Sequence, residues 1–374
     1  NNDRHTISFV FLSTTFIFGA LTGGIYTLLR GIRRIKDLAR ANISGSIAGL
    51  LAAVPIFYFY GIEGVVPAII ATSVFTYMNS IYLRKKVDVK SIKLSFKDTF
   101  VGGKEMVSLG IVLSVSSFLT VGVKFLLNAY ISKVGSLEEL GIYNAGQSIM
   151  AGYVGLVFTA MAGDYYPRLS GVIRNTKEWK RLVNQQAEIV VFILGPILTL
   201  ILLSAPVLIR VLLSAEFLPS IDFIVWASLS VLFRGISWVS GFIIIAKGDN
   251  KIFLYTQIAA QVWSLFFNIL FFNFLGIKGL GISLTLNNLL GAALMFFVLR
   301  NRYEFFLSKT AYILSGLNIL LVAVTVLFIA VFDYPNAYYF AGTTFIISVF
   351  ISLKGLNRRL DLIKILRKFR NRDT

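Results

Sequence analysis

Stretches of roughly 20 apolar residues recur along the whole chain, and short charged segments separate them. A stretch of this length is long enough to cross a bilayer as one helix. The pattern predicts eleven spanning helices. They are expected at Thr6–Leu29, Ala41–Tyr60, Gly64–Tyr82, Met106–Ile131, Leu140–Ala162, Gln185–Leu203, Ser220–Ala246, Ile252–Phe274, Gly279–Leu299, Thr310–Val331 and Ala337–Leu353.

Two prolines modify this expectation. Pro206 interrupts the apolar pattern, so Ser204–Ser220 is predicted to be irregular, with a half-helix or an interfacial turn at Val207–Leu213. Pro167 is expected to end the helix that precedes it, because proline has no backbone N–H to donate.

An internal repeat relates two parts of the pattern at a separation of 215 residues. Gly61-Ile-Glu-Gly64 falls on Gly276-Ile-Lys-Gly279, and the predicted span 6–29 falls on 221–244. The matching spans cross the membrane in the same direction, which indicates a parallel repeat with its axis along the membrane normal.

The repeat divides the chain into three parts. Residues 1–105 are expected to be the second half of one lobe, and residues 106–305 a complete second lobe of six spanning helices. Residues 306–374 would add two helices and a basic cytoplasmic tail, in which Leu356–Phe369 has the spacing of an amphipathic helix. By the same count, about 110 residues with three helices are expected before Asn1, giving fourteen helices in all.

The 36 Lys and Arg residues are distributed unevenly among the loops. When alternate loops are assigned to opposite sides of a membrane, thirty cations fall on one side. Only Arg4, Lys133, Arg210 and Lys278 fall on the other side, and two more lie inside apolar segments. Basic loops stay in the cytoplasm, so the chain is predicted to begin outside and to end with a cytoplasmic C-terminus.

Composition sharpens the class of protein. The chain is 56% hydrophobic and only 14% charged, and its mean hydropathy is +0.77, which predicts an all-α, polytopic membrane protein. The net charge of +18 is attributed to the loops, so no nucleic acid partner is expected. With no cysteine and a single histidine, thiolate chemistry, a metal site and a Ser-His-Asp triad are disfavoured, and the protein is not expected to be an enzyme.

Arg234 and Lys124 are the two cations inside apolar segments. A charge in mid-membrane is costly, so Arg234 is expected to face a water-filled cavity or an anion, such as a pyrophosphate that its planar guanidinium can bind. A structural arginine bonded to helix carbonyls is the alternative. Lys124 is a weaker second candidate, because a lysine at its depth can also extend to the interface.

Polar residues within spans form a second group of candidates. The amides of Asn128, Gln147, Gln257, Gln261 and Asn268 are expected to line a polar cavity, and hydrogen bonds between helices are the alternative for each. Asp164 and Arg168 stand four residues apart at a helix end and can pair. They are candidates for a cytoplasmic gate, and a helix cap with a positive anchor is the alternative.

Three stretches carry a resemblance to a known family. They are Gly141–Gly146 with Met161–Ser170, Ile35–Asn42 with Gly61–Pro67, and Ala246–Lys251. With these stretches the chain resembles the Wzx-type O-antigen and polysaccharide flippases of the MOP superfamily, whose fold is a MATE-like bundle of two helical lobes.

The resemblance implies a function and a location. The substrate would be an undecaprenyl-pyrophosphate-linked oligosaccharide, flipped by alternating access across the bacterial cytoplasmic (inner) membrane for surface polysaccharide and lipopolysaccharide synthesis. No cofactor is expected, and transport would be coupled to a proton or sodium gradient. Expected partners are the lipid-linked oligosaccharide, membrane lipids, and the polysaccharide polymerase and chain-length machinery.

Two other functions are open. MATE-type cation-coupled multidrug efflux is the main alternative, but it favours an acidic cavity, whereas the intramembrane charges here are positive. A membrane glycosyltransferase or polymerase would need a carboxylate base in a large loop. The longest loop between spans, 83–105, is dominated by lysine.

Overall fold

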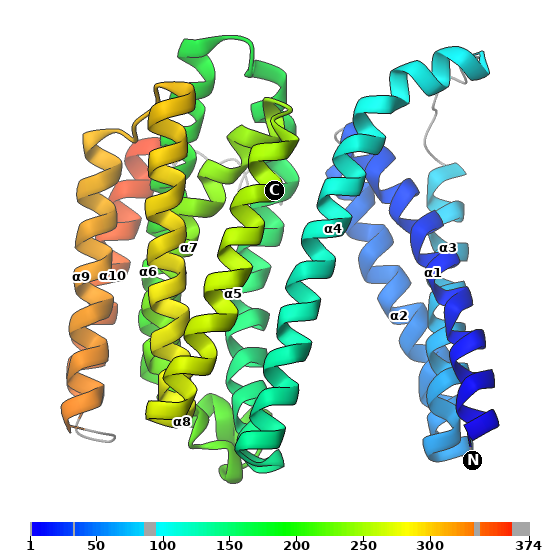
Figure 1. Ribbon diagram of the computed structural model, residues 1–374, viewed down its shortest axis with the longest axis horizontal. Helices are drawn as coiled ribbons and strands as arrows, with labels where there is room; N and C mark the ends of the chain where they lie inside the picture. Colours follow the sequence, from blue (N-terminus) through cyan, green and yellow to red (C-terminus); the bar gives the residue numbers. More distant parts are fainter. Residues whose placement is uncertain (1, 33, 86–94, 333–336, 361–374) are drawn as a thin grey trace, which may run out of the picture. The chain divides into compact units, whose positions relative to one another are not determined.

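The computed structural model describes residues 2–32, 34–85, 95–332 and 337–360, and every long element among them is a helix. Ten of these helices are long and apolar enough to cross a membrane, which confirms an all-α, multi-pass membrane protein. The chain forms two compact units, Asn1–Phe96 and Lys97–Thr374, drawn in blue and in cyan to red in Figure 1.

The first unit contains three long helices, α1 (Asn2–Gly31), α2 (Ile35–Tyr60) and α3 (Val65–Lys85), with a 3-10 turn, η1 (Gly61–Gly64), between the last two. Glycines of α2 let α3 approach closely. A Cβ atom on Gly49 would lie 2.6 Å from Cγ2 of Thr72, and the Thr72 hydroxyl donates to the Gly49 carbonyl at 3.3 Å. Small residues serve the same purpose in many membrane helix pairs.

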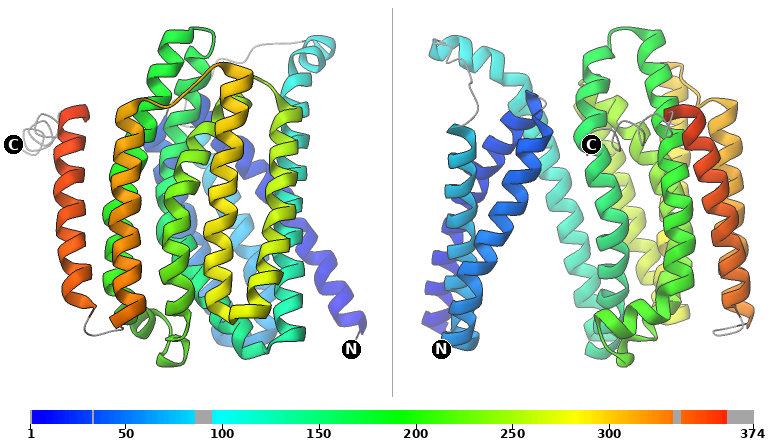
Figure 2. Two further views of the ribbon diagram at one scale, coloured as in Figure 1. Left: turned by 60° about the vertical axis from the view of Figure 1, so that its left-hand side comes forward. Right: turned by 180° about the vertical axis from the view of Figure 1, so that it is seen from behind.

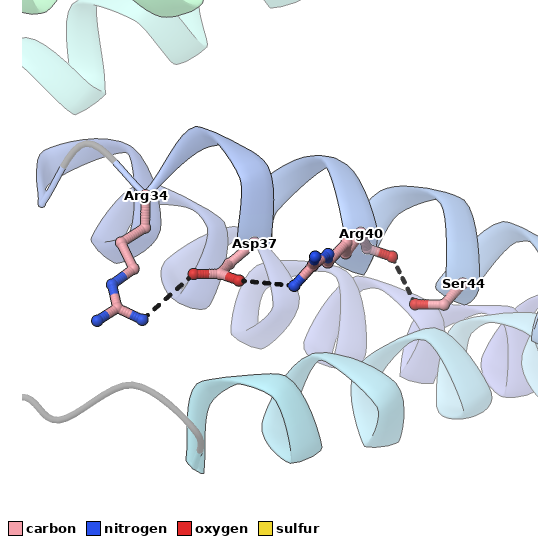
Figure 3. A network of polar contacts seen from close by, with 4 residues as sticks. All are labelled: Arg34, Asp37, Arg40 and Ser44. Atoms are coloured by element: carbon pink, nitrogen blue, oxygen red, sulfur yellow. Dashed lines mark hydrogen bonds and ion pairs between the residues drawn. The ribbon is translucent and has the colours of Figure 1, made fainter. Parts of the chain in front are cut away.

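A network of charged side chains occupies the start of α2 (Figure 3). Asp37 accepts from Arg34 at 3.4 Å and lies 3.8 Å from Arg40. The Ser44 hydroxyl donates to the carbonyl of Arg40 at 2.5 Å. An aspartate in the first turn interacts favourably with the helix dipole, so Asp37 stabilises the helix start and also pairs with Arg34 and Arg40.

The second unit holds the remaining elements. They are α4 (Phe96–Val134), α5 (Leu137–Val172), α6 (Thr176–Leu212), η2 (Ala215–Phe217), α7 (Ser220–Ala246), α8 (Asn250–Tyr303), α9 (Lys309–Phe332) and α10 (Tyr338–Leu360). Because α4 begins at Phe96 and not near Met106, residues 97–105 belong to this unit.

Side-chain caps fix two helix starts. The Ser136 hydroxyl accepts from the backbone N–H of Glu139 at the start of α5. The Asn175 side chain accepts from the N–H groups of Lys177 and Glu178 at the start of α6. Each cap satisfies donors that a helix N-terminus leaves without a partner.

The helix α6 forms the centre of the second unit. In the most apolar 18-residue stretch of α6, 61% of the residues are buried, whereas only 6% are buried in the corresponding stretch of α4. Figure 2 shows α9 and α10 beside α6. The core contains large aromatic side chains from three helices, among them Tyr165, Trp179 and Phe223.

Loops from several helices meet at one end of this unit, at the top in Figure 1, which we call the basic end. Lys180 donates to the carbonyl of Glu304 at 2.8 Å, and Asp249 lies 3.7 Å from Arg302 and accepts from the hydroxyl of Tyr303. The start of α6, the end of α8 and the turn between α7 and α8 therefore lie together. This end carries the loops predicted to be cytoplasmic.

Two expectations about proline are wrong. The helix α6 continues to Leu212 through Pro206, so 204–212 is not irregular, and α5 continues through Pro167 to Val172. A membrane helix tolerates proline where hydroxyls and neighbouring helices satisfy the freed carbonyls. The helix α6 is the most buried of the spanning helices, with 61% of its most apolar stretch buried, so its packing holds it in one piece past both prolines.

The helix α8 contains two of the predicted spans and reverses direction between them. Its 54 residues are interrupted at Gly276, where φ is 58° and ψ is −138°. Gly61, at the equivalent place after α2, has φ 54° and ψ −131°. The residues that precede the two copies also match, since Arg34 has φ −83° and ψ 61° and Asp249 has φ −78° and ψ 59°. The backbone therefore follows the repeat at both ends of the equivalent helices.

The predicted amphipathic tail lies largely outside the described residues, because α10 ends at Leu360. The assignment of 1–105, 106–305 and 306–374 to lobes and an additional helix pair stays a prediction.

Candidate functional site

The second unit contains an open cavity of about 570 Å³ between α4, α5, α7 and both halves of α8. Its walls alternate between aromatic, amide and charged side chains. Its lining includes Thr120, Lys124, Tyr143, Gln147, Arg234, Ser237, Trp238, Gln257, Ala260, Gln261, Ser264, Asn268, Asn287 and Gly291.

Two cations face this cavity from different helices. Arg234 lies in the middle of α7 and Lys124 lies on α4, and both side chains are exposed. The guanidinium carbon of Arg234 is 5.4 Å from the ring centroid of Phe158, within the range of a cation–π contact. None of the ion pairs in the described part of the chain involves either cation. None of the described residues that line the cavity carries a carboxylate, so its electrostatic potential favours an anion.

Amide side chains of α5 and α8 cover much of the rest of the wall. Gln147 donates to the hydroxyl of Tyr143 at 2.8 Å, and Asn268 donates to that of Ser264 at 3.1 Å. The Oδ1 atom of Asn287 is buried without a hydrogen-bond partner among the described residues. A buried amide oxygen without a donor is costly, so this wall offers acceptors to a ligand that carries hydroxyl groups.

Polar bonds join α4 to the first half of α8 along the cavity wall. Asn250 donates to Ser108 at 3.2 Å, Gln261 donates to Thr120 at 3.1 Å, and Tyr130 donates to Asn273 at 2.8 Å. The partners are 141 to 143 residues apart, so the two helices run parallel. Most of α4 is exposed, and these side-chain bonds form a seam between two helices that share little buried surface.

Most of the residues predicted from the sequence meet in this one cavity. Arg234, Lys124, Gln147, Gln257, Gln261 and Asn268 all line it. Asn128 does not line it, because α4 presents residues 120, 123, 124 and 127 and Asn128 falls at the edge of that face. Its Oδ1 atom is buried without a partner among the described residues.

Asp164 and Arg168 lie elsewhere on α5. Their side chains form an ion pair at 3.0 Å, and both are about half exposed, with 56% and 48% of the surface accessible. An exposed pair four residues apart contributes little to stability. The geometry is that of a surface pair on a continuous helix, and a gate role for the two residues stays a prediction.

Several lining residues were not predicted from the sequence, notably Tyr143, Ser237 and Trp238. A signal for two of them was available. Tyr143 precedes Gln147 by four residues and Trp238 follows Arg234 by four, which places each pair on one helix face. No group of three or more His, Asp or Glu residues in the described ranges could hold a metal ion.

Comparison with known proteins gives a family for this chain and solved structures with a similar fold. A family model described as "Polysaccharide biosynthesis protein" matches residues 1–222. No curated protein matches the chain.

Solved structures of membrane transporters are similar in fold. A MATE in complex with MaL6 has a TM-score of 0.67 at 16% identity, with 84% of this chain and 70% of that chain covered. The lipid II flippase MurJ, in its inward closed conformation, has a TM-score of 0.62 at 14% identity, with 94% and 73% covered. A MATE in the bent conformation gives a TM-score of 0.65 at 16% identity, with 85% and 69% covered.

Proposed function

Because the chain belongs to the family of polysaccharide biosynthesis proteins, we propose that it moves a lipid-linked oligosaccharide across a membrane and holds the head group in the cavity of the second unit. The observation that carries this proposal is the charge of the cavity: Arg234 and Lys124 face it, and no carboxylate among the residues that the structure describes does. A charge kept at mid-membrane against its cost of at least ~2.5–3.5 kcal/mol calls for a role, and binding an anion is the simplest one.

The two cations suit a pyrophosphate. A guanidinium can donate two parallel hydrogen bonds to phosphate oxygens, and an ammonium adds a second point charge. Since Arg234 and Lys124 come from different helices, one pyrophosphate would connect α7 to α4. Binding would therefore attach α4 to the unit at a second place, beside the bond between Gln261 and Thr120.

The amide wall suits the sugar units. Amides offer both donors and acceptors at fixed spacing, and hydroxyl groups of a saccharide need both. Trp238 adds an aromatic surface beside Arg234. A polar, largely pre-formed cavity of this size accepts the pyrophosphate and the nearest sugars, while the lipid chain remains in the bilayer.

The remaining parts of the proposal concern cellular context. The substrate would be an undecaprenyl-pyrophosphate-linked oligosaccharide, such as an O-antigen unit, flipped to the periplasmic leaflet of a bacterial inner membrane by alternating access. A proton or sodium gradient would supply the driving force, and the polymerase and chain-length proteins would receive the product. The basic end, and with it the C-terminus, would face the cytoplasm.

Cation-coupled drug efflux is the second candidate, because MATE transporters share the fold. A cationic drug would enter a cavity that already carries two positive charges, at an electrostatic cost and without a carboxylate to offset it. The charge of the cavity therefore favours an anionic substrate.

The direct test is charge removal at Arg234 in the intact protein. Arg234→Ala should abolish surface polysaccharide display while the amount of protein in the membrane stays unchanged. Arg210→Ala removes an exposed cation at the end of α6 and serves as the matched control, with display retained. Normal display from Arg234→Ala would refute the assignment of the cavity to the substrate head group.

A further inference from the structure

The cavity between α4, α5, α7 and α8 changes in character along its helices. One direction leads to the basic end, and the other leads to the bend of α8 at Gly276, which we call the far end (Figure 1). Trp238 and Phe242 follow Arg234 by one and two turns of α7, on the side of the basic end. Both rings line the cavity, with centroids 5.0 Å apart, so the wall on that side is partly aromatic.

Three amide side chains line the cavity on the other side of Arg234, toward the far end. They are Gln147 of α5 and Asn268 and Asn287 of the two halves of α8, and we call them the amide belt.

A contact between α5 and α7 fixes the level of Gln147. The ring centroids of Tyr143 and Phe223 lie 5.3 Å apart, and both helices run from there toward the basic end. Gln147 stands one turn after Tyr143, so it is level with the turn after Phe223. Arg234 lies two turns, or about 10 Å, further along α7.

The two asparagines lie at a similar level. Thr285 of α8 donates to the carbonyl of Trp226 at 2.7 Å, so Asn287, two residues later, is about 9 Å nearer the far end than Arg234. Asn268 and Asn287 stand on facing halves of α8, about 12 Å and about 17 Å from the bend. The belt therefore crosses the cavity at one level, below Arg234 as seen from the basic end.

The belt has hydrogen-bonding groups to spare. An amide side chain can form up to about four hydrogen bonds, and Gln147 and Asn268 each form one, to Tyr143 and Ser264. Asn287 forms none among the described residues, and its Oδ1 atom is buried. The two existing bonds hold their amides in place, and the remaining groups are available to a ligand.

The two cations point toward the space beside the belt. Tyr130 of α4 donates to Asn273 of α8 at 2.8 Å. Lys124 precedes the first of these by six residues and Asn268 precedes the second by five, so Lys124 is level with the belt. Helical side chains lean toward the start of their helix. Lys124 therefore leans toward the basic end, Arg234 leans toward the far end, and their charged groups approach each other just above the belt.

We propose that the amide belt binds the sugar joined directly to the pyrophosphate, so that the sugar lies on the far-end side of the two cations. This inference rests on the proposed function, because it takes the pyrophosphate to lie between Arg234 and Lys124. The first sugar is then within reach of the belt, whose amides supply both the donors and the acceptors that hydroxyl groups need. The three amides carry no charge, so the belt suits an uncharged sugar.

The experiment measures equilibrium binding of two ligands to the intact, purified protein. One is a bare polyprenyl pyrophosphate, and the other is the same lipid carrying a single uncharged hexose. The wild type should bind the hexose-bearing lipid more tightly. Asn287→Ala should weaken binding of that lipid by about threefold to tenfold and leave binding of the bare lipid unchanged, as expected for the loss of one hydrogen bond. Gln147→Leu should act in the same way.

Two further amides provide matched comparisons. Gln257 also lines the cavity, but it precedes Asn268 by eleven residues and so lies about 17 Å nearer the basic end. Gln257→Leu should therefore leave the ratio of the two affinities unchanged. Asn128 has a buried Oδ1 atom but does not line the cavity, and Asn128→Ala should bind both ligands like the wild type.

The outcomes separate this inference from the proposed function. Arg234→Gln should weaken both ligands equally, and if it weakens neither, the proposed function fails whatever the belt does. The belt is refuted if Asn287→Ala and Gln147→Leu leave the ratio of affinities unchanged, or if Gln257→Leu alone lowers it. Asn287→Ala breaks no hydrogen bond of the described residues, so its thermal unfolding midpoint should match that of the wild type. If it does not fold, Gln147→Leu decides the question.

Discussion

The α2–α3 hairpin and the two halves of α8 are copies of one backbone with different interiors. In both, a Gly-Ile-x-Gly turn reverses the chain, and a Cβ atom on its last glycine would meet an equivalent carbonyl. For Gly64 that carbonyl belongs to Ile56, and for Gly279 it belongs to Phe271, 215 residues later. The turn chemistry is thus the same in both copies, and differences elsewhere must come from the side chains.

The first copy is closed by close packing. Gly45 and Gly49 of α2 face Thr76 and Thr72 of α3, and the threonine hydroxyls point to the glycine carbonyls at 3.5 Å and 3.3 Å. At the equivalent positions of the second copy stand Ala260, Ser264, Gly291 and Asn287, and all four line the cavity. Equivalent positions therefore make a closed helix pair in one unit and a cavity wall in the other.

The neighbouring helix shows the same contrast. The residue of α1 that corresponds to Arg234 is Gly19, where an added Cβ atom would meet nothing within 4 Å. A repeat can thus keep its backbone while one copy acquires the charge and amides of a polar cavity. The cation at Arg234 is not part of the duplicated framework.

The same substitution should have opposite effects in the two copies. Gly291→Leu adds a side chain where nothing lies within 4 Å, so it should leave stability unchanged and reduce transport about tenfold or more by filling the cavity. Gly49→Leu places its Cβ 2.6 Å from Thr72 and should lower the free energy of unfolding by about 1–3 kcal/mol. Thermal unfolding and a proteoliposome flipping assay measure the two effects, and a stable, fully active Gly291→Leu would contradict the account.

The two turns should respond alike to alanine. Gly61 and Gly276 have positive φ with ψ of −131° and −138°, a region that other residues rarely adopt. Gly61→Ala and Gly276→Ala should each cost about 1–3 kcal/mol of stability. Gly241→Ala, in the helical part of α7 with open space around its Cα, is the control and should cost nothing. If alanine left stability unchanged at one turn but lowered it at the other, the two copies would differ in backbone as well.

The smallest expected effect concerns the seam. Gln261 corresponds to Ser46 in the first copy, so Gln261→Ser reproduces that copy and removes the bond to Thr120. Hydrogen bonds between membrane helices contribute about 0.6 kcal/mol on average. A double-mutant cycle with Thr120→Val should return a coupling of this size, and a coupling of zero would show that the seam does not hold the helices together.

Features with a strong local cause could be predicted from the sequence. The spans followed from length and hydropathy, and the repeat followed from the spacing of Gly61 and Gly276, which the backbone at both glycines bears out. Arg234 was found because a charge within an apolar segment is costly wherever it points.

Features that depend on packing were not predictable in the same way. Pro206 does not end α6, which is the most buried of the spanning helices, and no local sequence pattern reveals that packing. Tyr143 and Trp238 line the cavity, yet aromatic residues are common throughout the apolar segments. Glu188 lies near a loop in the sequence, and its burial depends on α9 and α10, far along the chain.

The central claim is that the cavity of the second unit binds an anionic head group through Arg234 and Lys124, and equilibrium binding to the intact protein tests it most directly. A polyprenyl-pyrophosphate oligosaccharide should bind to the wild type, and Arg234→Gln with Lys124→Gln should weaken binding by at least about 30-fold, as expected when about 2 kcal/mol or more of charge pairing is lost. A lipophilic cation should bind more weakly than the anion to the wild type and gain affinity in the double variant. Unchanged anion binding in the double variant, or tighter binding of the cation by the wild type, would contradict the account.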